Sequence, residues 1–182
     1  MFQDKRSKKI VLVAHCILNQ NSKIDACAYY PGAILEATKT LLNADVGIIQ
    51  MPCPELLYLG LDREADPTAN CTIESEDTRV AFRMKEEQAK TLCQSLVDCI
   101  VYQVEEYIKH GFQIVGLIGI NGSPTCGIET TWADDHALDG RGVFIDTLEQ
   151  SLKNKSIFIK LVGIRAKDPQ HAIATIENLL NN

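Results

Sequence analysis

Four short apolar segments rich in valine and isoleucine stand out along the chain, and none of them shows regular alternation with polar residues. They cover residues 10–14, 46–49, 114–120 and 157–162. Strands that are buried on both faces have this continuous apolar character, whereas strands with one face in water alternate. The pattern therefore predicts four strands in a sheet that is covered on both sides.

Between these segments, apolar residues recur at helical spacing over residues 34–42 and 92–107. A last helix is expected to begin at Asp168, an N-cap residue, with Pro169 in its first position. Strands that alternate with helices indicate a parallel sheet. We predict an α/β protein in which residues 1–182 form a single domain, a three-layer Rossmann-like or flavodoxin-like fold with a four- to five-stranded, mainly parallel sheet. The order of the strands cannot be read from the pattern.

The stretch from residue 62 to residue 78 interrupts this alternation. It is polar, contains Pro67 and carries six acidic residues. We expect it to form a long surface loop between the second strand and the long helix. Loops of this length often serve as lids over a binding site.

The charge of the chain narrows the classes of partner. Eighteen Lys and Arg against twenty-four Asp and Glu give a net charge of -6, which disfavours nonspecific binding of nucleic acid. The basic run from Lys5 to Lys9 is expected to be a solvated flank. No segment approaches the roughly 20 apolar residues of a membrane span, and His15 does not fit the cleavage site of a secretory signal. We expect a cytoplasmic protein with a small-molecule partner, no membrane and no nucleic acid, and a homodimer is one option for its assembly.

Three of the seven cysteines follow predicted strands. Cys16 comes after the first strand, Cys53 after the second and Cys126 after the third. Loops at the carboxyl ends of parallel strands converge on one crevice, so these three thiols should meet there. Cys93 and Cys99 fall in the long helix and are expected to pack as small apolar residues. The remaining two, Cys27 and Cys71, lie in loops and are read as incidental or as a spare ligand.

The spacing of the cysteines bears on the metal they could hold. A structural zinc site needs four ligands that commonly come in closely spaced pairs, and the sequence has no CxxC. A 4Fe-4S cluster accepts thiolates that are far apart in the chain. With three cysteine ligands, one iron is left open as a Lewis acid. A cluster on Cys16, Cys53 and Cys126 is therefore the expected cofactor.

The segments around these cysteines resemble the 2-thiouracil desulfidase family, the TudS-like proteins. The resemblance rests on Cys16-Ile17-Leu18, on Cys53-Pro54-Glu55 with Gly60-Leu61 and Arg63, and on Ser123-Pro124-Thr125-Cys126-Gly127, with a weaker match from Gly140 to Leu148. It implies a 4Fe-4S cluster on the three cysteines and active-site roles for Glu55 and Ser123. The chain departs from the family at Leu57-Tyr58-Leu59 and at Asn121-Gly122, which points away from thiouracil itself as the substrate.

The predicted function is desulfidation of a small thiocarbonyl compound. The open iron would bind the sulfur of the substrate, Glu55 would deprotonate the attacking water, and Ser123 would orient the substrate or stabilise developing charge. Two alternatives stay open. One is a metal-free hydrolase or transferase with Cys16 or Cys126 as nucleophile. The other is a noncatalytic sensor or carrier of an iron-sulfur cluster or of sulfide.

Overall fold

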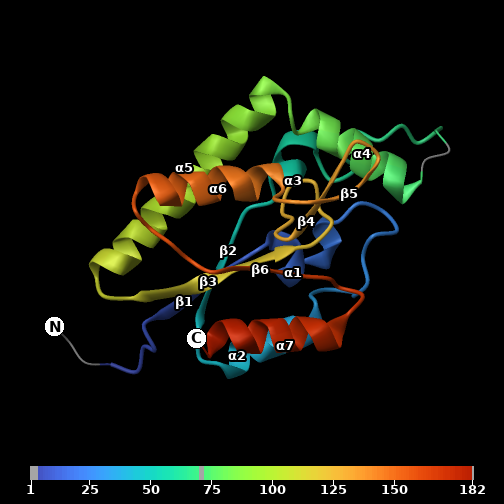
Figure 1. Ribbon diagram of the computed structural model, residues 1–182. Coiled ribbons are helices and arrows are strands. Elements are labelled where there is room, and N and C mark those ends of the chain that lie inside the picture. Colours follow the sequence, from blue (N-terminus) through green and yellow to red (C-terminus); the bar gives the residue numbers. More distant parts are fainter. Residues whose placement is uncertain (1–3, 70–71, 182) are drawn as a thin grey trace.

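Four parallel strands form the central sheet of the computed structural model, which describes residues 4–69 and 72–181 (Figure 1). The strands are β1 (Lys9–Val13), β2 (Gly47–Gln50), β3 (Gln113–Ile120) and β6 (Leu161–Ile164), in the order β2-β1-β3-β6. This is the order of the first four strands of a flavodoxin-like sheet. The predicted α/β class and parallel sheet are confirmed.

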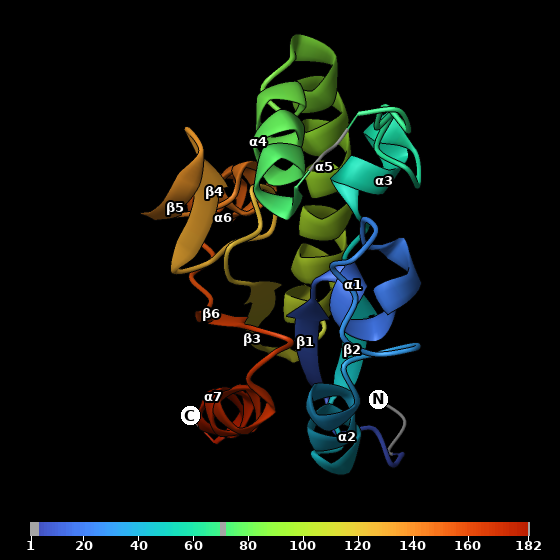
Figure 2. The ribbon, with the colours of Figure 1, turned by 90° about the vertical axis from the view of Figure 1, so that its right-hand side faces the viewer.

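Helices cover both faces of the sheet and produce the three layers (Figures 1 and 2). One layer holds α2 (Leu35–Asn43) and α7 (Pro169–Leu180), and the other holds α5 (Glu87–Lys109) and α6 (Val143–Asn154). Between them the residues Val11, Leu12 and Val13 of β1 are completely buried, as the continuous apolar pattern predicts. The last helix begins where expected, because the carboxylate of Asp168 accepts the backbone N–H of His171 at 3.2 Å.

The remaining elements gather at the edge of the sheet where the strands end (Figure 2). Short helices follow β1 and β2: α1 (His15–Leu18), the 3-10 turn η1 (Gln20–Ser22) and α3 (Pro54–Leu59). A further helix, α4 (Ile73–Arg83), precedes α5, and an antiparallel hairpin of β4 (Thr130–Ala133) and β5 (His136–Asp139) follows β3. These elements surround the ends of the strands.

The structure corrects three expectations about the elements. The fourth strand begins at Leu161 rather than at residue 157, because residues 157–160 first leave α6 and only Lys160 reaches β3, accepting the N–H of Leu117. Residues 73–78 belong to α4 rather than to a loop, since Thr72 and Ser75 form a reciprocal capping box that starts a helix there. The β4–β5 hairpin was not predicted.

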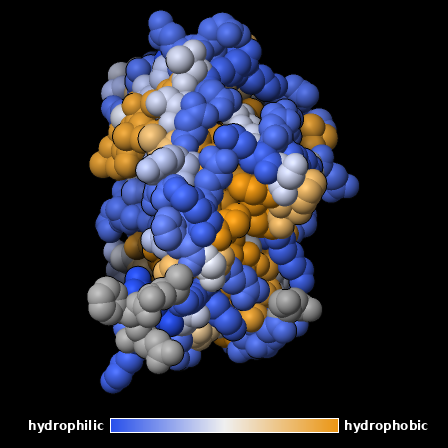
Figure 3. Space-filling model, turned by 90° about the vertical axis from the view of Figure 1, so that its left-hand side faces the viewer, coloured by the Kyte–Doolittle hydropathy of each residue, from blue (hydrophilic) through white to orange (hydrophobic). Residues whose placement is uncertain are grey.

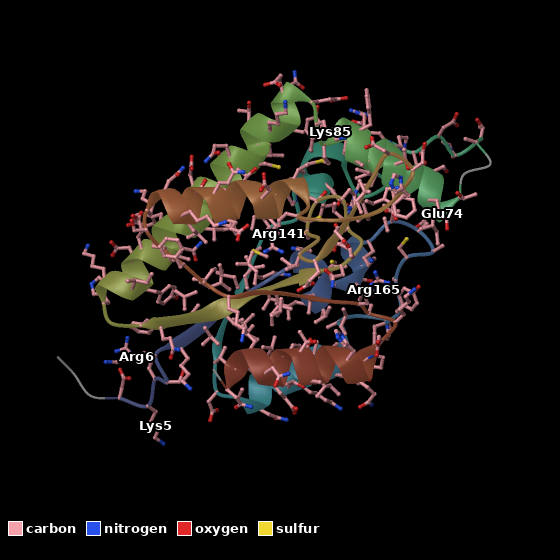
Figure 4. The ribbon with its side chains drawn as sticks, viewed as in Figure 1. Lys5, Arg6, Glu74, Lys85, Arg141 and Arg165 are labelled. Atoms are coloured by element: carbon pink, nitrogen blue, oxygen red, sulfur yellow. The ribbon has the colours of Figure 1, made fainter. Side chains whose placement is uncertain are left out.

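The basic residues near the N-terminus lie at the end of the sheet where the strands begin (Figure 4). Lys5 and Arg6 lie at the end opposite to Glu74 and Arg165 (Figure 4), and Arg6 pairs with Asp4 on an exposed flank, as expected for the basic run. The side on which the strands begin is largely hydrophilic, with a band of hydrophobic side chains across it (Figure 3). Within the described ranges, no helix combines the length and the apolarity that a membrane crossing requires.

Candidate functional site

A cavity of about 310 Å³ opens at the carboxyl ends of the strands, and Cys16, Cys53 and Cys126 all line it. Cys16 lies in α1 just after β1, Cys53 lies between β2 and α3, and Cys126 lies in the loop after β3. The cavity therefore sits where the strand order reverses between β1 and β3, the position at which open α/β sheets bind ligands. Three thiols that are distant in sequence meet at one edge.

Cys53 is held at the start of a helix. It is the N-cap residue of α3, with φ -90° and ψ 108°, and Pro54 takes the first helical position. Proline suits that position because its ring fixes a helical φ and the missing N–H would be unpaired there anyway. The Cys-Pro-Glu sequence thus places a thiol at the helix start and a carboxylate, Glu55, in the first turn.

The loop that carries Cys126 is held in shape by the hydroxyl group of Ser123, which belongs to the same loop. Ser123 Oγ accepts the backbone N–H groups of Thr125 at 3.2 Å and of Cys126 at 3.0 Å. Close backbone approach explains two glycines: a Cβ on Gly127 would lie 2.2 Å from the carbonyl oxygen of Thr130, and one on Gly142 would lie 2.3 Å from the carbonyl carbon of Thr125. Side chains at these positions would displace the loop.

A second set of bonds ties this loop to the sheet. Asn121 Oδ1 accepts the N–H of Glu129 at 3.0 Å, and the N–H groups of Ile128 and Thr130 lie 3.4 Å from it. Glu129 Oε1 in turn accepts the N–H of Gly163 in β6 at 3.1 Å. The loop of Cys126 is therefore anchored to the neighbouring strand.

Arg63 is buried beside Cys53 with all five of its N–H groups directed at acceptors. Its exposed fraction is 1%. Nη1 donates to the carbonyls of Gly60 and Leu61 at 2.6 and 3.1 Å, and Nη2 donates to that of Ser22 at 2.6 Å. Nη2 also lies 3.9 Å from Cys53 Sγ. Since a guanidinium carries five donors in a rigid fork, this set binds the segment after α3 to η1 and to the cysteine.

The fifth donor of Arg63 turns to Glu55. Nε lies 3.5 Å from Oε2 of Glu55, whose side chain is 16% exposed and lines the cavity. Both residues that the resemblance implies for the active site, Glu55 and Ser123, thus lie in the wall of the same cavity as the three cysteines.

The three thiols are poor nucleophiles in these surroundings. Burial raises the pKa of the Cys53 thiol to about 12 and raises that of Cys16. Burial, followed by the proximity of Cys53 and Cys16, holds the pKa of Cys126 well above its usual range. Because the thiolate is the reactive form, this environment disfavours a metal-free cysteine nucleophile at neutral pH.

The histidines supply no base for these thiols. His15 is the first residue of α1, and it does not line the cavity. Burial lowers its pKa, and its Nε2 is buried without a hydrogen-bond partner within the described ranges. The other three, His110, His136 and His171, are exposed at the surface.

The cysteines outside the proposed ligand set differ in their burial and in their contact with the cavity. Cys93 is 3% exposed and packs in the core as predicted, whereas Cys99 on the same helix is exposed, so that expectation was wrong. Cys27, which the sequence left open as incidental or as a spare ligand, lines the cavity. Cys71, the other candidate for a spare ligand, lies outside the described residues.

Three further residues of the cavity wall escaped the sequence reasoning: Lys23, Asp77 and Trp132. Lys23 follows η1, Asp77 lies in α4, and Trp132 lies in β4. Trp132 Nε1 donates to Thr78 Oγ1 at 2.9 Å and so joins the hairpin to α4. The acidic stretch of residues 62–78 was the available signal for Asp77. Because this stretch was predicted to be a loop, the sequence did not indicate which of its carboxyl groups faces the cavity.

The donor set determines which cofactor the site suits. Soft thiolate ligands favour Cu(I), zinc and iron-sulfur clusters over hard cations. Within residues 4–69 and 72–181, no group of three or more His, Cys, Asp or Glu side chains is arranged to hold a metal ion. In an iron-sulfur cluster each cysteine binds a different iron, so the ligands need not converge on one point. Three thiols around one cavity fit that requirement.

Comparison with known proteins identifies a relative that aligns with this chain over nearly its whole length. No family model matches the chain, and no solved structure matches it. The chain is 33% identical over 177 residues to the uncharacterized protein MJ0003 of Methanocaldococcus jannaschii, an alignment that covers 96% of this chain and 99% of that protein. The chain belongs to the same protein family as this archaeal relative.

Proposed function

We propose that the protein is an iron-sulfur-dependent desulfidase that removes sulfur from a small thiocarbonyl compound, with a 4Fe-4S cluster on Cys16, Cys53 and Cys126. One observation supports this above the others: the three thiols reach a single cavity from the ends of β1, β2 and β3. When bound, such a cluster would supply an open iron that acts as a Lewis acid toward sulfur.

The proposed relation to the TudS-like family is supported by where its motifs lie. From the Cys-Pro-Glu segment, Cys53, Glu55 and Arg63 line the cavity, and from the Ser-Pro-Thr-Cys-Gly segment, Ser123 and Cys126 do so. The motifs lie far apart in sequence, yet their side chains share one wall. This placement supports the proposed relation.

In this proposal Glu55 acts as the general base. Arg63, whose Nε lies 3.5 Å from Oε2 of Glu55, fixes the direction of the carboxylate. A carboxylate can accept a proton from water, and a base placed in this way contributes about 10²- to 10⁴-fold in rate. The product of water attack on the thiocarbonyl carbon is the corresponding carbonyl compound, and the sulfur leaves as hydrosulfide.

Ser123 has a narrower role. Its oxygen already accepts two backbone N–H groups, so the hydroxyl proton is the part left to act on a ligand. Its acceptor capacity is used within the loop. Ser123 therefore acts as a hydrogen-bond donor toward the substrate and at the same time holds Cys126 in place.

The cofactor is tested by iron and acid-labile sulfide content after anaerobic purification. Wild-type protein should contain about four of each per chain, as the cluster formula requires. Cys53→Ala should lose both, and Cys99→Ala, which changes an exposed cysteine on α5, should keep both. A colourless wild-type protein would contradict the cofactor.

Activity is tested by sulfide release from a set of thiocarbonyl compounds, including 2-thiouracil, 4-thiouracil and thioacetamide. Glu55→Gln should lower kcat by about 10²- to 10⁴-fold and leave iron and sulfide unchanged. Glu87→Gln is the matched control, since Glu87 is 88% exposed on α5. A loaded protein that releases no sulfide from any of these compounds would favour a noncatalytic cluster carrier instead.

A further inference from the structure

The cavity contains a second carboxyl group besides Glu55. Asp77 reaches its wall from α4, whereas Glu55 comes from the first turn of α3. The two helices are separate elements, and the two carboxyls are near enough for the charge of Glu55 to act on Asp77. The site therefore presents a pair of carboxyl groups to whatever occupies the cavity.

The two carboxyls have different partners. Glu55 has the buried guanidinium of Arg63 at 3.5 Å. Asp77 forms no hydrogen bond or ion pair with its side chain within the described ranges, although it is partly buried. The guanidinium holds the Glu55 carboxylate in one orientation, whereas burial without a bonded partner favours the neutral form of a carboxyl group such as that of Asp77. When two carboxyls in one site differ in this way, one suits the role of base and the other that of acid.

Asp77 is also held firmly in position. The turn that carries it begins at the capping box of Thr72 and Ser75. The next residue, Thr78, accepts the indole N–H of Trp132 at 2.9 Å, and Trp132 itself lines the cavity. These contacts fix the helical turn from which the side chain of Asp77 reaches the cavity wall.

We propose that Asp77 is the general acid of the reaction and Glu55 its base. The inference rests on the proposed desulfidase function and adds a residue that neither the cysteine motifs nor the resemblance indicates. The protonated carboxyl of Asp77 delivers a proton to the departing sulfur. A protonated donor at this point lowers the barrier to breaking the carbon–sulfur bond, because hydrosulfide is a better leaving group than sulfide dianion.

The proton balance closes with these two groups and one water. Glu55 takes one proton of the water as its oxygen bonds to the thiocarbonyl carbon. The carbon–sulfur bond then breaks, and the proton of Asp77 goes to sulfur. The second water proton leaves the new hydroxyl and returns to Asp77, which forms the carbonyl product. Thiocarbonyl and water are thus converted to carbonyl, hydrosulfide and one proton, which Glu55 releases to solvent.

Charged neighbours both raise and lower the pKa of Asp77. Burial and the negative charge of Glu55 raise its pKa to about 6, and Glu74 and Glu76 on its own helix add to the rise. Lys23, from the segment after η1, opposes it. The same segment brings the Cys27 thiol close to Asp77. The net effect leaves Asp77 able to exchange a proton near neutrality, as a general acid must.

The test compares Asp77→Asn, Asp77→Glu and the control Glu74→Gln, an exposed carboxylate on the same helix. Wild-type kcat should fall as the pH rises through the pKa of Asp77, since the acid form is then lost. Asp77→Asn should lower kcat by about 10²- to 10⁴-fold with unchanged iron content, and should abolish that alkaline fall. Asp77→Glu should restore part of the rate together with the fall. Glu74→Gln should keep the wild-type maximal kcat and the alkaline fall, with the midpoint shifted slightly to lower pH because the charge of Glu74 no longer raises the pKa of Asp77.

A second measurement does not depend on turnover. Infrared difference spectra of the loaded protein between pH 4 and pH 8 should contain a protonated-carboxyl band that disappears with a midpoint near pH 6 and is absent in Asp77→Asn. Loss of this band in Glu74→Gln instead, or an Asp77→Asn enzyme with wild-type kcat and pH profile, would overturn the assignment. Absence of sulfide release in the wild type counts against the desulfidase itself, so the two failures differ.

Discussion

Nη2 of Arg63 lies 3.9 Å from Sγ of Cys53 and donates to the carbonyl of Ser22 at 2.6 Å. One nitrogen thus connects the loop after α3, the thiol before that helix and the turn after α1. A buried cation in this position both binds the wall of the cavity together and offers positive charge beside a cysteine. Removal of this cation should lower the stability of the protein and disturb the wall of the cavity.

Arg63→Met should destabilise the protein by about 3–5 kcal/mol, because it removes the guanidinium donors from the carbonyl groups of Gly60, Leu61 and Ser22 and the cation from Glu55. The free energy of unfolding in urea measures the effect. Arg165→Met is the control, since Arg165 is exposed, and it should change stability by less than about 0.5 kcal/mol. Equal effects of the two substitutions would contradict the bonding of Arg63.

The hydrogen bond from Trp132 to Thr78 should couple the hairpin to α4. Trp132→Phe and Thr78→Val each remove this bond. The loss of unfolding free energy in the double variant should be smaller than the sum of the two single losses, by about 0.5–1.5 kcal/mol. Hydrogen exchange of the α4 amides should speed up in all three variants. Strict additivity of the two substitutions would show that the bond contributes nothing.

Gly142→Ala should displace the loop of Cys126. The added Cβ would lie 2.3 Å from the carbonyl carbon of Thr125, a backbone atom that cannot rotate away, and overpacking of this kind costs about 1–3 kcal/mol. Iron content should fall with it if Cys126 is a ligand. Gly32→Ala is the control, because a Cβ there meets nothing within 4 Å. Wild-type thermal stability in Gly142→Ala would argue against the close approach.

Asp77 should make stability depend on pH in a direction unusual for a carboxylate. Its pKa rises from 3.8 to about 6 in the folded chain, so the folded state binds the proton more tightly than the unfolded state. The free energy of unfolding should therefore fall as the pH rises from about 4 to 6, by about 1–2 kcal/mol after allowance for partial exposure.

Asp77→Asn should remove this fall and be the more stable protein at pH 7. The difference between the two pH profiles isolates Asp77 from the other carboxyls. Glu74→Gln should retain the fall, since the backbone of the first turn of α4 lowers the pKa of Glu74 instead. Parallel profiles for wild type and Asp77→Asn would contradict the raised pKa.

Much of the fold could be predicted because the sheet is buried on both faces. Apolar character alone predicted strands at residues 10–14 and 114–120, and Asp168 with Pro169 predicted the start of the last helix. The start of β6 was missed because residues 157–160 are as apolar as the strand that follows. Phe158 is nevertheless 78% exposed, and nothing in the hydropathy pattern distinguishes an exposed connection from a buried strand.

The site was predictable where position along a strand determines position in space. Cys16, Cys53 and Cys126 each follow a strand, so the parallel sheet alone brings them to one edge. Lys23, Asp77 and Trp132 lie outside the central sheet. Lys23 follows η1, and the approach of Asp77 and Trp132 depends on how α4 packs against the hairpin. That packing is set by tertiary contacts such as the bond between Trp132 and Thr78, which no local pattern encodes.

The anchoring of the Cys126 loop to β6 has a consequence for the order of assembly during synthesis. A nascent chain that ends before Leu161 already contains all three cysteines, yet it lacks the Gly163 N–H that secures Glu129 and, through it, the loop. A metallocentre that requires all three thiols would therefore gain a fully anchored Cys126 loop only after β6 has paired with β3.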